Sequence, residues 1–268
     1  MAQQFSTIAE EEGKLSIGSR ALLLFASIVL MVVAVLQLQP KRGQDYASDG
    51  LPHTPASDLP VEPEIPVQPD APLPMGVSYQ VPFTVQAPFL SWNQAKYQNA
   101  CEEASILMVW HWLTGNPLNA QIAYDSIAEI VAYEQEHFGY YIDTSAEDTA
   151  RLMRDYYGHK QVETTLDVTV ERIKQELQAG NLIIVPADGT KLGNPNFVPP
   201  GPDRHMLVIT GYDDEKGVFI TNDPGTRNGE DYPYAYKILL SAIRDYQSGD
   251  HQPIFGNAKV MIIIEPMR

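Results

Sequence analysis

Four short apolar segments in the second half of the chain predict β-strands. Several of them lack the polar residue at every second position that marks a half-exposed strand, so we expect a sheet that is covered on both faces. The turn-rich sequence DDEKG between the second and third segments predicts a hairpin and therefore antiparallel pairing. The four segments are LIIVPA (182–187), HMLVITGY (205–212), GVFITND (217–223) and AKVMIII (258–264).

Three other segments predict helices. In residues 104–113 the sequence ASILMVWHWL is nearly all apolar, which predicts a helix buried on most sides, and Asn99 is the expected N-cap. Helices concentrated before a mostly antiparallel sheet are typical of an α+β domain. The other two helices are SAEDTARLMRDYYG, capped by Thr144 or Ser145 and ended by Gly158, and TVERIKQELQAGN, from Thr169 to Gly180.

The first third of the chain has a different composition. Residues 21–38, ALLLFASIVLMVVAVLQL, form an apolar run that spans ~27 Å as a helix, close to the thickness of a bilayer core. The competing interpretation is a cleaved signal peptide. It fits less well, because Glu10, Glu11 and Glu12 precede the run and no small-x-small cleavage site follows it. We therefore expect an uncleaved single-pass membrane anchor that contacts the lipid bilayer from Ala21 to Leu38.

The segment that follows the anchor is rich in proline, serine and acidic residues, which predicts an extended spacer without a core. The expected organisation is a tail (1–20), the anchor (21–38), the spacer (39–76) and one domain (77–268). The spacer would hold this domain away from the membrane, on the extracytoplasmic side. Lysine and arginine flank the run on both sides, so the positive-inside rule does not decide the orientation.

The charge of the chain excludes one class of partner. The net charge is −16, and no cluster of Lys or Arg is larger than Lys41–Arg42. Nucleic-acid binding requires a basic face, so no nucleic-acid partner is expected. The chain has one cysteine and therefore no internal disulfide.

That cysteine, Cys101 in YQNACEEAS, is the first candidate for chemistry. It lies at the expected start of the apolar helix, where the helix macrodipole lowers the pKa of a thiol and favours the nucleophilic thiolate. Glu102 and Glu103 occupy the first turn, where carboxylates suit the positive end of the dipole. The alternative interpretation is a small buried apolar residue.

A histidine and an aspartate in the predicted hairpin are candidate partners. If the loop comprises Asp213 to Gly217, Leu207 lies opposite Asp223, and Asp223 is diagonal to His205 on the same face. A loop one residue shorter would reverse this parity. Cysteine, histidine and aspartate together make a nucleophilic site. Separately, His205 is a residue at a strand end and Asp223 a turn former.

These motifs resemble the C39-like cysteine peptidases, which have a papain-like fold. The resemblance covers residues 77–268 and is carried by VPFTVQAP, YQNACEEAS, GNPNFVPPGPDRH and HMLVITGYDDEKGVFITNDPG. It implies that Cys101 is the nucleophile, His205 the general base and Asp223 the orienting carboxylate. It also implies a glutamine that completes the oxyanion hole. Gln86 is favoured, Gln98 is the reserve and Gln94 is a third candidate, whereas the common position six residues before the cysteine holds Ala95.

Three functions follow from this resemblance. The first is a membrane-anchored peptidase that cleaves peptide or protein substrates through an acyl-enzyme. The second is a cell-wall amidase or acyl transferase with the same triad, and the third is a binding module without turnover. The intact set of three residues argues against the third. No cofactor is expected.

Two weaker signals are interpreted as structural. Glu134, Glu136 and His137 match no metal-site spacing, and we expect a solvated helix end there. The segment DPGTRNGED (223–231) lacks the full calcium-loop pattern, so a turn-rich loop is expected.

Overall fold

The computed structural model describes residues 75–256 and 258–267. The predicted membrane anchor at 21–38 and nearly all of the spacer lie outside these ranges. Within them, no helix is both long enough and apolar enough to span a bilayer. The first described element is β1 (Gly76–Ser78), one residue before the predicted start of the domain.

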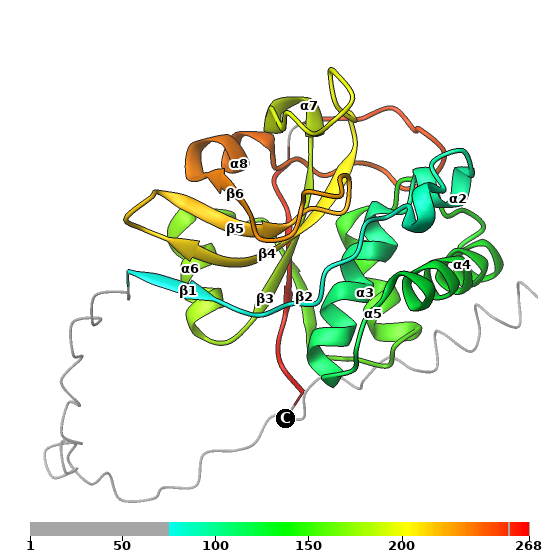
Figure 1. Ribbon diagram of the computed structural model, residues 1–268, viewed down its shortest axis with the longest axis horizontal. Helices are drawn as coiled ribbons and strands as arrows, with labels where there is room; N and C mark the ends of the chain where they lie inside the picture. The colour runs from blue at the N-terminus through cyan, green and yellow to red at the C-terminus, as the bar shows by residue number, and fades with distance from the viewer. Residues whose placement is uncertain (1–74, 257, 268) are drawn as a thin grey trace, which may run out of the picture. The chain divides into compact units, whose positions relative to one another are not determined.

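One antiparallel sheet forms the centre of the described residues (Figure 1). The last strand in the chain is inserted between two earlier ones, and β1 pairs with the C-terminal end of the long strand that begins at His205. In spatial order the other strands are β2 (Val162–Thr165), β7 (Met261–Ile264), β3 (Leu182–Ala187), β4 (His205–Asp213), β5 (Val218–Asn222) and β6 (Tyr232–Ala235).

Helices cover both faces of this sheet (Figure 1). The group on one face precedes most of the strands in the chain, so the described residues form an α+β domain, as predicted. That group comprises η1 (Pro88–Leu90), α2 (Ala95–Gln98), α3 (Cys101–Thr114), α4 (Ala120–His137) and α5 (Ala146–Asp155). The other face is covered by α6 (Val170–Gln178), α7 (Gly189–Leu192) and α8 (Tyr236–Ala242).

The central strands bury side chains in two separate apolar clusters. Along β4, Met206 and Val208 belong to the cluster beneath α3 and α5, whereas Leu207 and Ile209 belong to the cluster beneath α6 and α8. Each strand thus needs apolar residues at odd and at even positions. This two-sided burial is the reason that β3 and β4 show no polar alternation in the sequence.

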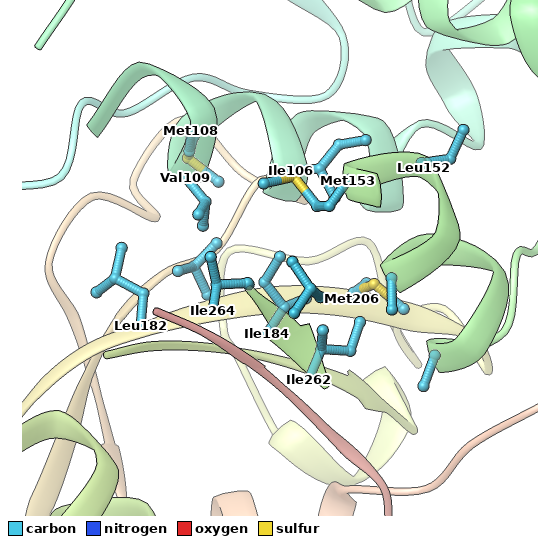
Figure 2. Packing of buried hydrophobic residues seen from close by; sticks show 14 of the residues in the cluster. Ile106, Met108, Val109, Leu152, Met153, Leu182, Ile184, Met206, Ile262 and Ile264 are labelled. Carbon is cyan, nitrogen blue, oxygen red and sulfur yellow. The ribbon is translucent and has the colours of Figure 1, made fainter. Parts of the chain in front are cut away.

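Figure 2 shows the cluster between α3, α5 and the sheet. Ile106 and Val109 of α3 and Met153 of α5 lie above Ile184 of β3 and Ile264 of β7. Packing of this kind gives roughly 25 cal/mol per Å² of apolar surface removed from water. The cluster therefore fixes the position of α3, and with it Cys101, against the sheet.

Helix α3 is buried along most of its length, as its apolar sequence predicts. A second cluster on its other side joins it to α2 and α4. The prediction of Asn99 as its N-cap is wrong, because the cap position is Ala100 and no side chain caps the helix. Asn99 instead ends α2, where its Nδ2 donates to the carbonyl of Ala95. The cap moves one residue later because α2 runs up to Gln98.

The caps of the next two predicted helices are confirmed. Ser145 accepts a hydrogen bond from the backbone of Asp148 at the start of α5, and Thr169 does the same for Arg172 at the start of α6. Strand β3 has the predicted bounds, whereas β7 is shorter than the predicted segment 258–264. The strands β1, β2 and β6 and the helices η1, α2, α7 and α8 were not predicted, and of α4 only the C-terminal end was expected.

The loop between β4 and β5 is one residue shorter than predicted. Asp213, not Tyr212, pairs with Val218, so the predicted register beside the turn is wrong. By itself this change would reverse which side chains face each other across the hairpin.

A bulge at Thr210 restores the predicted register farther from the turn. The pairing shifts by one residue between Ile209 and Gly211. Beyond the bulge Val208 pairs with Asn222, which is the pairing that the longer loop would have produced. Asp223, the next residue, therefore emerges on the side of His205.

Two carboxyl groups lie in the core between α3 and α4. Glu103 and Glu134 are completely buried, and no other side chain among the described residues hydrogen-bonds to either carboxyl group. The prediction of a solvated helix end is therefore wrong for Glu134, although Glu136 and His137 are exposed. Burial raises the pKa of Glu134 from 4.5 to about 8, and burial together with the charge of Glu134 raises the pKa of Glu103 well above its ordinary value.

We expect Glu134→Gln to stabilise the protein above neutral pH. Because folding raises the pKa of Glu134 from 4.5 to about 8, the folded state binds the extra proton and stability falls as the pH rises through this range. Glutamine abolishes this titration. By differential scanning calorimetry, Tm at about pH 8 should exceed that of the wild type by roughly 3 °C or more, with little difference at about pH 5.

The matched control is Glu136→Gln, which removes an exposed carboxyl group from the same helix turn. It should leave Tm unchanged at both pH values. A Glu134→Gln protein that is less stable than the wild type at pH 8 would contradict the titration argument.

Candidate active site

A cavity of about 520 Å³ brings together residues from distant parts of the chain. Cys101, His205, Gln86 and Gln98 all line it. They come from the start of α3, the start of β4, the loop before η1 and the end of α2. The cavity therefore brings together four of the sequence-predicted site residues, whereas Asp223 does not line it.

His205 and Asp223 form a buried hydrogen-bonded pair. The Nε2 atom of His205 lies 2.7 Å from Oδ1 of Asp223, and the two side chains are 2% and 0% exposed. The imidazole ring also packs edge-on against Phe197, with ring centroids 5.4 Å apart. Because Asp223 takes Nε2, the ring nitrogen left for other chemistry is Nδ1.

Asp223 is held by further donors. The hydroxyl of Tyr234 donates to Oδ2 at 2.6 Å, and the backbone N–H of Gly225 donates to Oδ1 at 2.9 Å. Asn194 in turn donates to the hydroxyl of Tyr234. Burial acts to raise the pKa of Asp223, but the charge of His205 and these hydrogen bonds outweigh it and lower the pKa. Asp223 is therefore a carboxylate of fixed orientation.

The environment of the Cys101 thiol differs from the expectation. The thiol donates to Oε2 of Glu102, with 3.0 Å between Sγ and the oxygen, and Cys101 is 6% exposed. Burial and then the charge of Glu102 raise the pKa of Cys101 well above its ordinary value. The predicted lowering by the helix macrodipole is thus wrong for this state. Burial and the neighbouring carboxylate oppose ionisation of the thiol more strongly than the helix N-terminus favours it.

The three candidate glutamines have different surroundings. Gln86 is 5% exposed, its backbone N–H donates to Pro224, and its Nε2 donates to the carbonyl of Gln98 at 2.7 Å. Gln98 is exposed and lines the same cavity. Gln94 is exposed and does not line the cavity. Gln86 and Gln98 therefore share a cavity with Cys101, and Gln94 does not line it.

The sequence did not indicate the residues that surround Cys101 and the hydrogen-bonded pair of His205 and Asp223. Tyr234 and Asn194 lie in YPYAY and GNPNF, where no motif distinguishes them from other turn and strand residues. Glu102 was assigned only to the helix dipole, and nothing along the chain connects it with Tyr246. Their contacts depend on strand pairing and on loop paths, which local patterns do not encode.

The described residues form no metal site at this cavity. Within the described residues, no group of three or more His, Cys, Asp or Glu side chains is arranged to hold a metal ion. The segment 223–231 is a turn-rich loop, as predicted. It supplies Gly225 to the Asp223 network.

Comparison with known proteins identifies the family. A model described as the Peptidase_C39 like family matches residues 79–252, which is more than half of the chain. The chain therefore belongs to the Peptidase_C39 like family. The resemblance noted from the sequence motifs is confirmed. No curated protein matches the chain.

Two solved structures are similar to the chain. One is a protein from Bacillus anthracis assigned to the C39-like peptidases, with 14% identity and a TM-score of 0.46 over 72% of this chain and 99% of that chain. The other is xylellain, a cysteine protease from Xylella fastidiosa, with 12% identity and a TM-score of 0.42 over 73% of this chain and 87% of that chain. At these TM-scores neither structure assigns a role to a residue of this chain.

Gly225→Ala should impair the site without disrupting the fold. A Cβ atom at Gly225 would lie 2.9 Å from Cε1 of His205 and 3.2 Å from Oδ1 of Asp223, so the ring or the loop has to move. Displacements of about 1 Å at a reacting group can cost on the order of 100-fold in rate. We expect labelling of Cys101 by an electrophilic cysteine probe to slow by about tenfold or more.

The control is Gly139→Ala. Gly139 has a left-handed backbone, with φ of +84°, but no atom lies within 4 Å of an added Cβ. This variant should lower Tm and leave labelling unchanged. Equal labelling of the wild type and Gly225→Ala would show that the close packing around His205 does not matter to the thiol.

Proposed function

We propose that this protein is a membrane-anchored papain-like cysteine peptidase that hydrolyses peptide bonds in peptide or protein substrates. Cys101 is the nucleophile, His205 the general base and Asp223 the orienting carboxylate. Gln86, with Gln98 as the reserve, donates to the oxyanion. The observation that carries the proposal is the buried hydrogen bond between His205 and Asp223 beside a cavity that also contains the single cysteine of the chain.

The proposed reaction has two halves. The thiol proton of Cys101 passes to Nδ1 of His205 while Sγ attacks the substrate carbonyl carbon. The tetrahedral intermediate collapses as the C–N bond breaks, and His205 gives its proton to the leaving amine. Water then attacks the thioester with His205 as base, the C–S bond breaks, and the proton returns to Sγ.

Asp223 supports this cycle electrostatically. Its lowered pKa keeps it ionised, so it accepts the Nε2–H bond in every step and stabilises the imidazolium when Nδ1 is protonated. The interaction takes place away from solvent, where charges act on each other more strongly than in water. The donors Tyr234 and Gly225 prevent the carboxylate from turning toward another partner.

The walls of the cavity suit a polypeptide. Trp92, Phe197 and Val198 provide apolar surface for side chains, and Val198 is 87% exposed. Asp143 and Arg204 add a charged side, where Arg204 Nε lies 3.3 Å from Oδ2 of Asp143. The mixture of apolar and polar walls is usual for a substrate site.

Asp223→Asn should retain the fold and lose most of the turnover. An amide at this position can donate to the imidazole and hold the wrong tautomer, and the equivalent exchange in a serine-protease triad lowers kcat by about 10⁴. The measurement is hydrolysis of a broad peptide library, with products identified by mass spectrometry. Products with a free carboxylate indicate hydrolysis, whereas an acyl group transferred to an added amine would indicate a transferase.

Two further variants give reference points for this loss of activity. Cys101→Ala should abolish acyl-enzyme formation. Tyr234→Phe removes one donor to Asp223 but keeps the carboxylate, so its loss of activity should be much smaller, on the order of tenfold. Near-normal activity of Asp223→Asn would mean that another carboxylate orients His205. Asp203, which lines the cavity, would be the next candidate, whereas Asp213 lies at the opposite end of β4.

Membrane anchoring is the second part of the proposal and is supported by the apolar run at 21–38. The full-length protein should remain in the membrane fraction after a carbonate wash at high pH, because a transmembrane helix is held by its apolar surface and not by charge. Deletion of residues 21–38 should release it. Extraction of the full-length protein by carbonate would instead indicate a peripheral or cleaved form.

A further inference from the structure

The side chain of Glu102 is buried beside the proposed nucleophile. Glu102 is 1% exposed, although it lies in the first turn of α3. The thiol of Cys101 donates to its Oε2 atom across 3.0 Å. Among the residues that the structure describes, the hydrogen-bond partner of the thiol is therefore Glu102 and not His205.

Tyr246 binds the other oxygen of the same carboxyl group. Its hydroxyl donates to Oε1 of Glu102 at 2.7 Å and lies 3.4 Å from the backbone oxygen of His205. Tyr246 is 2% exposed and follows α8, 144 residues after Glu102 in the chain. One tyrosine thus connects the start of α3, which bears the nucleophile, with the start of β4, which bears the base.

These two donors define the form of Glu102. A carboxylate is acceptor-only and satisfies both the thiol and the tyrosine hydroxyl, whereas a protonated carboxyl group would direct its own proton at one of them. Burial raises the pKa of Glu102, while its hydrogen bonds from Cys101 and Tyr246 act to lower it. The other groups that act on it electrostatically are Asp143, Glu103 and Glu134, and within the described part of the chain no cation pairs with it.

The charge of Glu102 affects the neighbouring thiol, although an uncharged side chain of the same shape would pack equally well. A glutamine would fill the same space and accept the same hydrogen bond from Tyr246. Only a carboxylate opposes loss of the proton from a thiol 3.0 Å away. The arrangement therefore suppresses thiolate formation in the state that the structure describes.

This inference rests on the proposed role of Cys101 as the nucleophile. We propose that Glu102 and Tyr246 are positioning residues that hold the Cys101 thiol protonated and directed away from His205 until substrate enters the cavity. When substrate binds, the thiol turns to Nδ1 of His205 and gives up its proton there as Sγ attacks the carbonyl carbon. Glu102 stays bound to Tyr246 throughout. The free protein is thereby protected from oxidants and electrophiles, which react with thiolates.

The test is the pH dependence of alkylation by iodoacetamide in the full-length protein. Cys101 is the only cysteine, so the rate reports on one thiol. Glu102→Gln removes the charge and keeps the shape of the side chain. The midpoint of the rate profile should move to lower pH by about one unit or more, which corresponds to roughly tenfold faster alkylation below the midpoint.

Two variants separate this effect from a general loss of buried charge. Glu103→Gln changes a buried glutamate in the same turn that adjoins Glu134, and it should shift the midpoint by less than half as much. Tyr246→Phe removes the donor to Oε1, which raises the pKa of Glu102 and leaves it neutral over a wider range. Its midpoint should move in the same direction as that of Glu102→Gln, and the double variant should move no farther than Glu102→Gln alone.

A Glu102→Gln midpoint equal to or above that of the wild type overturns the proposal. If Glu102→Gln does not fold, Tyr246→Phe decides, and an unmoved midpoint overturns it. Peptide hydrolysis by His205→Ala tests the proposed function separately. If His205→Ala hydrolyses peptides as fast as the wild type while Glu102→Gln shifts the alkylation midpoint, then Glu102 holds the thiol but the assignment of His205 as base fails.

Discussion

The burial of both faces of β3 and β4 is the constraint on which the site depends. One face packs against α3, so that Cys101 belongs to the same apolar cluster as Met206, the residue that follows His205. The other face packs against α6 and α8. With both faces covered, β4 has no freedom to rotate, and the first residue of that strand stays at the wall of the cavity. The core therefore sets the placement of the cysteine and the histidine, and the hydrogen bonds of Asp223 and Tyr246 add to it.

Two buried carboxyl groups contact the two proposed reacting groups. Asp223 is hydrogen-bonded to the imidazole of His205, whereas Glu102 accepts a hydrogen bond from the thiol of Cys101 and disfavours its ionised form. Each carboxyl group is oriented by a buried tyrosine, Tyr234 in one case and Tyr246 in the other. In the state described, the proton is therefore retained on the sulfur of Cys101, and the proposed base is His205 together with Asp223.

The hairpin shows how a correct placement can follow from a partly incorrect register. The sequence predicted that Asp223 would reach His205, but through a longer loop than the one observed. The shorter loop and the bulge at Thr210 each shift the pairing by one residue, and the two shifts cancel. Turn residues indicate that a hairpin exists, whereas loop length and bulges depend on how the strands twist against their neighbours. The same limit applies to α3, whose cap was displaced from Asn99 by the unexpected helix α2.

Apolar periodicity, capping residues and short motifs are local properties of the chain, so the strands β3, β4 and β5, the cap Thr169 and the three residues proposed for catalysis could be read from the sequence. The cap of α5 was narrowed only to Thr144 or Ser145. The tertiary structure decided the properties that require distant segments to meet. These are the burial of Glu134 against Glu103, the support of Asp223 by Tyr234, and the contact of Glu102 with both Cys101 and Tyr246. Each depends on the loss of water around a charged or polar group, and desolvation is set by what packs around the group in three dimensions.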